Sequence, residues 1–136
     1  MQTLSAVLHQ GDQDPALQEI ILALASAGER ISAKLRLGAL ASILGDAKKV
    51  NVQGEQQKKL DIIVNQIVID KLSSLKAVAG MASEEEEQFI TGHPEGRYLV
   101  MFDPLDGSSN IDIDISVGTI FSLLMKPCLL YTSDAA

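Results

Sequence analysis

The sequence predicts a layered α/β or α+β domain, because segments with helical spacing come first and segments of strand length follow. In the first half, apolar side chains recur at intervals of three and four residues. After residue 76 they form short continuous or alternating runs instead. Two separate blocks of this kind favour helices packed on a sheet, and 136 residues are the size of one domain.

The first long helix is expected to begin after Asp14, a good N-cap residue, with Pro15 in its first turn. Gly28 interrupts the helical pattern, which allows a kink or a close contact with another helix. Gly38 and Gly45 are expected to mark the helix end and the following loop. The apolar face of this helix consists of Leu17, Ile20, Ile21, Leu24, Ile31 and Leu35.

A second helix is expected from about Gln56. Asp61 and Asn65 are one turn apart on a polar stripe of this helix, so they could face a site. The neighbouring apolar face consists of Leu60, Ile63, Val64, Ile67 and Leu72.

Two strands are expected next. Residues 76–82 form a short apolar run, and the acidic residues 84–87 follow at its exit. Residues 98–102 form a continuous apolar run, so Asp103 should emerge at the C-terminal end of a strand. The Asp-Pro and Asp-Gly pairs that follow are expected to end this strand at once.

Two further strands are expected near the end of the sequence. Residues 111–115 alternate strictly between apolar and acidic, which suits a half-buried strand. Asp112 and Asp114 would then lie on its outward face and be structural. Residues 117–125 are mostly apolar, which suits a buried strand.

Composition excludes several classes of partner. A formal charge of −7 and a pI near 4.7 argue against nucleic acid and anionic membranes. A single cysteine, Cys128, allows no internal disulfide and fits a reducing compartment. The first residues lack the features of a secretory signal, and no apolar run reaches the length of a membrane span. We therefore expect a cytoplasmic enzyme.

Residues 103–110 are the most informative stretch, because they place two carboxylates three positions apart ahead of a donor-rich turn. Mg²⁺ prefers carboxylate and carbonyl oxygens, which a tight turn can supply from Asp103, Asp106 and the carbonyl of Leu105. Backbone N–H groups and hydroxyls can bind phosphate oxygens. The same short Asp-Pro-x-Asp-Gly string is also ordinary turn chemistry, so the residues alone leave both readings open. The candidate hydrogen-bond donors to a phosphate are Gly107, Ser108 and Ser109.

Three blocks in this order closely resemble class I fructose-1,6-bisphosphatases, a family of Mg²⁺-dependent sugar phosphatases. They are residues 51–61, residues 82–86, and residues 102–112 with 116–122. The resemblance runs from about Leu17 to Lys126. It implies a layered sugar-phosphatase fold, with N-terminal helices packed on a mixed, largely antiparallel sheet.

The resemblance also implies domain limits. Residues 1–126 are expected to form a partial N-terminal fructose-bisphosphatase domain, and residues 127–136 a non-family tail of artefactual origin. The family continues for a comparable length, and that region supplies a further metal-binding carboxylate and most sugar contacts. A truncated sheet would expose apolar strands, so the chain alone is expected to have little or no turnover.

Site residues follow from the same resemblance. Two or more Mg²⁺ ions per site, or Mn²⁺ in their place, are implied. Asp61 and Glu85 match the positions that orient or deprotonate the attacking water. The implied metal ligands are Glu84, Asp103, Asp106, the carbonyl of Leu105 and, near the metals, Glu55. The implied substrate contacts are Asp106, Gly107, Ser108 and Ser109.

The implied substrate is fructose 1,6-bisphosphate, hydrolysed at its 1-phosphate by a homotetramer in gluconeogenesis or the Calvin cycle. Arg97 and Tyr98 resemble a family pair that helps to bind AMP. The alternatives are a related phosphatase for inositol phosphates or sedoheptulose 1,7-bisphosphate, and a non-catalytic remnant that binds metal. Without the resemblance, residues 84–87 would be a solvated acidic surface and Asp61 a polar surface residue.

Overall fold

The fold comes from a computed structural model that describes residues 1–44, 50–107 and 116–127. For residues 38–44 and 50–58 only the backbone is described. Ser108, Ser109 and the strand expected at 111–115 therefore lie outside the described residues, as does the tail from residue 128.

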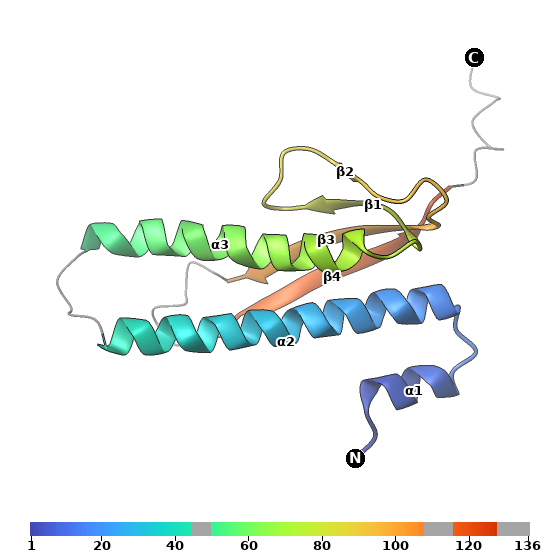
Figure 1. Ribbon diagram of the computed structural model, residues 1–136, viewed down its shortest axis with the longest axis horizontal. Helices are drawn as coiled ribbons and strands as arrows, with labels where there is room; N and C mark the ends of the chain where they lie inside the picture. Colours follow the sequence, from blue (N-terminus) through green and yellow to red (C-terminus); the bar gives the residue numbers. More distant parts are fainter. Residues whose placement is uncertain (45–49, 108–115, 128–136) are drawn as a thin grey trace.

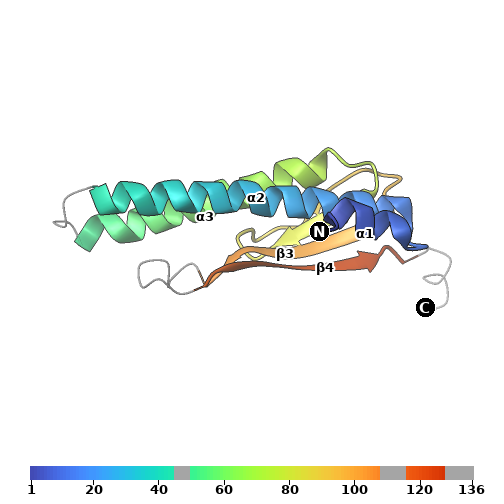
Figure 2. The ribbon, with the colours of Figure 1, turned by 90° about the horizontal axis from the view of Figure 1, so that it is seen from below.

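The described residues form a layer of helices on one face of a mixed sheet (Figures 1 and 2). The sheet has the order β2-β1-β3-β4, in which β1 and β3 are parallel and the two outer pairs are antiparallel. The layered fold class predicted from the sequence is therefore confirmed. The helices are α1 (Leu4–Gln10), α2 (Pro15–Leu44) and α3 (Val50–Ser73), and the strands are β1 (Val78–Ser83), β2 (Ile90–Thr91), β3 (Tyr98–Asp106) and β4 (Gly118–Met125).

Helix α2 starts where the sequence predicts. The Asp14 carboxylate accepts a hydrogen bond from the backbone N–H of Ala16 at 3.0 Å, as an N-cap residue does. The expected end at Gly38 is wrong, because the helix continues to Leu44. No atom lies within 4 Å of the position a Cβ would take at Gly28, so this glycine makes no close helix contact. Helix α1, capped by Thr3, was not predicted.

Helix α3 begins at Val50, before the predicted start at Gln56. Its buried face carries Val64, Val68 and Leu72, all fully buried. Ile63 was expected on this face, but its side chain is 45% exposed. The face that packs on the sheet is therefore narrower than the apolar residues of this helix suggest.

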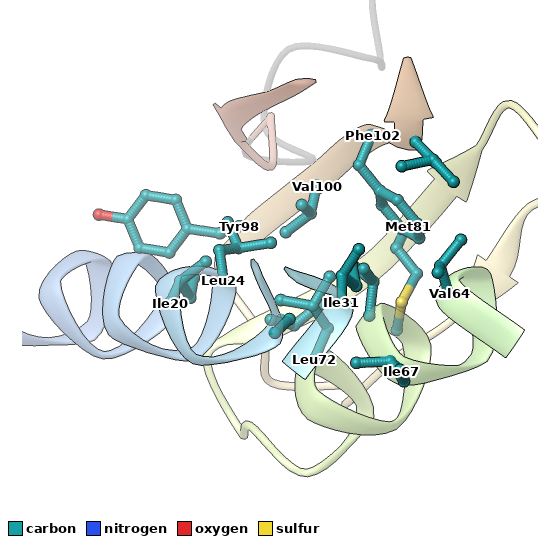
Figure 3. Packing of buried hydrophobic residues seen from close by; sticks show 14 residues of the cluster. Ile20, Leu24, Ile31, Val64, Ile67, Leu72, Met81, Tyr98, Val100 and Phe102 are labelled. Carbon is teal, nitrogen blue, oxygen red and sulfur yellow. The ribbon is translucent and has the colours of Figure 1, made fainter. Parts of the chain in front are cut away.

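The core lies between the helical layer and strands β1 and β3 (Figure 3). Ile20, Leu24 and Ile31 of α2 pack with Met81 of β1 and Val100 of β3. The burial of β1 alternates only in part, because its register with β3 shifts between Val78 and Gly80. Of the described helices, none is both long and apolar enough for a membrane span.

Strand β3 does not end at Asp103, as predicted, but continues through Pro104 to Asp106. The pairing explains how a proline is tolerated. The β1 partners of β3 end with the pair Ser83 and Phe102, so beyond that point β3 pairs only with β4. The register with β4 shifts between Asp103 and Asp106, and proline is accepted at such an edge and irregularity.

Strand β4 forms at the predicted place, but the prediction that it is buried is wrong for the described structure. Most of its side chains are exposed, with Met125 70% and Ile120 57% exposed. No described element covers the sheet face opposite the helices (Figure 2). The expected exposure of apolar strand residues is therefore confirmed.

Candidate active site

The acidic residues come together because β1 and β3 run in parallel. Ser83 at the end of β1 is level with Phe102 of β3, and the Glu84 N–H donates to the Phe102 carbonyl at 3.0 Å. Glu84 and Asp103 each follow one of these paired residues, so their side chains leave the sheet at the same edge. An open hollow of about 430 Å³ at this edge is lined by Glu84, Asp103 and residues of the adjoining strands.

The acidic side chains at this edge are close enough to change one another's pKa values. A hydrogen bond with Asp103 raises the pKa of Glu84 above its usual 4.5, and the charges of Asp103, Glu85 and Asp106 act in the same direction. The pKa of Glu85 is also raised, first by partial loss of hydration and then by the charges of Asp61, Asp103 and Glu86. Helix α3 thus brings Asp61 close enough to act on Glu85.

Hydrogen bonds hold the last residues of β3 in place. The Asp103 carboxylate accepts from the N–H of Leu105 at 3.0 Å, and the Thr119 hydroxyl donates to the carbonyl of Pro104 at 3.0 Å. Gly107 has a φ of 84°, a conformation that favours glycine. These features fix the backbone path between the two aspartates and the entrance to the donor-rich turn.

Most of the predicted site residues gather at this edge. The structure brings Asp61, Glu84, Glu85, Asp103 and Asp106 into one acidic neighbourhood. Leu105 is buried in the strand between the two aspartates. Gly107 follows as the first residue of the turn. Glu55 lies in α3, where only the backbone is described, so its side chain is not placed.

Two polar residues support this edge, and one of them was not predicted. Asn65 was expected to face a site, and it donates a hydrogen bond to Glu86 at 2.7 Å. Ser83 was missed, although its hydroxyl donates to Asn65 at 2.7 Å. The signal in the sequence was a single hydroxyl at the end of an apolar strand, directly before an acidic run. Glu86, interpreted as a plain surface residue, is exposed but belongs to this network.

The donor set fits a hard divalent cation such as Mg²⁺. Carboxylates and a backbone carbonyl are the ligands such ions prefer, and a nearby cation would relieve the repulsion among these carboxylates. In the conformation of the described residues, no group of three or more His, Cys, Asp or Glu side chains is closed around a common point. The metal-ligand and catalytic roles remain predictions.

A second polar cluster lies at the other end of β3. The Asp14 carboxylate accepts hydrogen bonds from the Tyr98 hydroxyl at 2.8 Å and the Arg97 guanidinium at 2.7 Å. These bonds, with the Ala16 N–H, hold the pKa of Asp14 below its usual 3.8. The cluster ties the start of α2 to the start of β3, and Figure 3 shows the Tyr98 ring beside α2.

A helical layer on a mixed sheet, with carboxylates at the ends of two parallel strands, places the chain in the class of layered α/β proteins whose candidate site lies at the carboxyl ends of the strands. The family model described as "Fructose-1-6-bisphosphatase, N-terminal domain" matches residues 3–133. The chain therefore belongs to the fructose-1,6-bisphosphatase family.

Individual relatives agree with this assignment. The chain is 59% identical over 120 residues to a class 1 fructose-1,6-bisphosphatase of Neisseria meningitidis serogroup A, covering 88% of the chain and 37% of the relative. It is 50% identical over 135 residues to that of Acinetobacter baylyi, covering 97% of the chain and 42% of the relative. The chain thus spans about two fifths of the length of these relatives.

Solved structures show the same fold. The fructose-1,6-bisphosphatase of Leishmania major in its holo form superposes with a TM-score of 0.76 at 33% identity. The match covers 93% of this chain and 39% of that one. The apo form of the same enzyme gives a TM-score of 0.73 at 30% identity, covering 93% and 37%.

Proposed function

We propose that this chain is the N-terminal part of a Mg²⁺-dependent enzyme that hydrolyses the 1-phosphate of fructose 1,6-bisphosphate. The products are fructose 6-phosphate and inorganic phosphate. The observation that carries the proposal is the acidic neighbourhood of Asp61, Glu84, Glu85, Asp103 and Asp106 at the end of β1 and β3. Family membership, and the activity named for the relatives, support the choice of substrate.

The chemistry requires positive charge at this edge. A phosphate monoester already carries about two negative charges, and its alkoxide leaving group is poor, so the uncatalysed reaction is extremely slow. Bound Mg²⁺ supplies charge neutralisation and makes water a better nucleophile. The residues that would hold it are Glu84, Asp103, Asp106, the carbonyl of Leu105 and, from α3, Glu55; Mn²⁺ could replace it.

Glu85 and Asp61 would orient the attacking water and accept its proton. The raised pKa of Glu85 suits this task, since a carboxylate with a higher pKa is a stronger base. Asp61 approaches from α3, so the helix and the strand ends would act on one water molecule together.

Substrate binding would use the turn after β3. Asp106, Gly107, Ser108 and Ser109 would contact the sugar phosphate through backbone N–H groups and hydroxyls. The rest of the sugar pocket would come from the part of the relatives that this chain does not match. The proposal includes a cytoplasmic homotetramer acting in gluconeogenesis or the Calvin cycle, which rests on the family resemblance alone.

A chimaera tests the substrate. Residues 1–126 would replace the matching region of the Neisseria meningitidis relative, and Mg²⁺-dependent phosphate release would be measured with three substrates. We expect fructose 1,6-bisphosphate to be preferred over sedoheptulose 1,7-bisphosphate and inositol monophosphate. A clear preference for inositol monophosphate would show that these residues belong to a different phosphatase.

The 136-residue chain by itself is expected to show little or no turnover. The alternative is that the isolated chain only binds metal or pairs with an intact subunit, and the exposed apolar face of β4 supports the pairing. Robust phosphate release by the pure chain would contradict this expectation. Size-exclusion chromatography with light scattering would show whether the chain is monomeric.

A further inference from the structure

We infer that Asn65 and Ser83 are positioning residues, which fix the acidic segment 84–86 against helix α3 through a chain of hydrogen bonds that starts from this buried pair. The inference rests on the proposed function and adds to it two residues with a stated role. Neither residue would touch metal or substrate. Both would act by holding Glu84 and Glu85 in place beside Asp61.

The chain of hydrogen bonds is continuous. The Ser83 hydroxyl donates to the Asn65 side-chain oxygen at 2.7 Å. The Asn65 side-chain nitrogen donates to the Glu86 carboxylate at 2.7 Å, and the Glu85 N–H donates to the Ser83 hydroxyl at 3.2 Å. Glu85 is therefore flanked on both sides by residues of the network.

Burial gives the link its rigidity. Asn65 is 4% exposed and Ser83 7% exposed, and on α3 Asn65 lies between the fully buried Val64 and Val68. Buried polar groups in such a layer must be hydrogen-bonded to each other, which leaves them few alternative arrangements. An apolar pair would fill the same space, so packing alone does not account for an amide and a hydroxyl here.

The acidic segment needs such a link because its charges repel one another. Glu84 and Asp103 follow paired residues of two neighbouring strands, and Glu85 comes next in the chain, so like charges are held close together. The side chains of residues 84–87 are exposed, and none of them belongs to the apolar core of the described residues. Asn65 lies one helical turn after Asp61, so its bond to Glu86 sets the distance between Asp61 and Glu85.

The test measures Mn²⁺ binding to the purified 136-residue chain by electron paramagnetic resonance, with thermal unfolding followed in parallel. Asn65→Leu keeps a side chain of similar size but leaves the buried Ser83 hydroxyl without its acceptor, so the unfolding temperature should fall by about 4 to 10 °C. It should also lower Mn²⁺ affinity by about tenfold to a hundredfold, as the loss of a residue that orients metal ligands does. A purely structural role predicts the same fall in unfolding temperature with unchanged Mn²⁺ affinity.

Ser83 and the neighbouring Gln66 provide matched comparisons. Ser83→Ala removes one oxygen atom and should also weaken Mn²⁺ binding, whereas Ser83→Thr retains the hydroxyl and should restore it. Gln66→Ala is the control, because Gln66 is exposed and bonds only within its helix, to Asp70 at 2.7 Å. It should leave affinity unchanged. If Asn65→Leu fails to fold, the Ser83 pair decides the question.

The outcomes separate the two proposals. Affinity of Asn65→Leu or of Ser83→Ala equal to that of the parent chain overturns the positioning role and leaves the proposed function in place. Equal Mn²⁺ binding by the parent chain and by a Glu84→Gln, Asp103→Asn double variant overturns the metal site itself. Loss in both positioning variants with recovery in Ser83→Thr supports the inference.

Discussion

Replacing Leu72 by Ala tests which face of α3 packs on the sheet. Leu72 is fully buried, and its truncation removes three carbon atoms, worth about 2.4 kcal/mol at about 0.8 kcal/mol per methylene. The remaining cavity adds to this loss, so a total of about 3 kcal/mol is expected. With 136 residues and about 2.1 cal/mol/K per residue, that loss lowers Tm by roughly 10 °C.

The matched control is Ile62→Ala on the same helix. Ile62 is 61% exposed, and surface changes of this kind stay within about 0.5 kcal/mol. The higher helix propensity of Ala compensates part of the lost contact. Both variants would be unfolded by heat with circular dichroism at 222 nm as the signal. Equal losses in the two variants would refute the packing face described for α3.

Three other predictions concern backbone space, charge and the site. Gly28→Ala should stabilise the chain by about 1 kcal/mol because the position is open. Gly96→Ala should destabilise the chain because a Cβ would meet the backbone of β1. Urea unfolding measures the stability of both variants. The pKa of Asp14 is lowered on folding, so its contribution to stability is present above its ordinary value of 3.8 and is lost as pH falls through the folded value. The Tm difference between the parent and Asp14→Asn should therefore be constant near neutral pH and should shrink towards zero in acid. A Tm difference that stays unchanged down to pH 2 would contradict this. In the chimaera, Asp103→Asn should abolish nearly all Mg²⁺-dependent phosphate release while Glu87→Gln stays close to the parent.

Much of the helical layer could be predicted because its signals are local. Asp14, Pro15 and the apolar spacing of α2 define a helix start and a buried face within a few residues. The helix end was less clear, since Gly38 only weakens a helix and does not stop it. Helix α1 is short, with one buried residue, so its apolar pattern gave little signal.

The site residues that are adjacent in the sequence could be predicted. The features that depend on strand pairing or on contacts between distant elements were missed. The aspartates of residues 103–106 could be recognised as a unit, but the passage of β3 through Pro104 depends on where β1 ends. The exposure of β4 depends on a covering layer, which a strand's own sequence cannot reveal. Ser83 became meaningful only once Asn65 of α3 was found beside it.

The repulsion among the carboxylates at the end of β1 and β3 also opposes folding. The pKa of Glu84 is higher in the folded chain than in the unfolded chain. Bringing the charged Glu84 side chain to Asp103 at neutral pH is therefore unfavourable. The hydrophobic core beneath must compensate for this. The sequence thus gives up stability to keep a charged edge, a trade-off typical of functional sites. A substitution such as Glu84→Gln would raise the free energy of unfolding but would remove a negative charge that the proposed metal site requires.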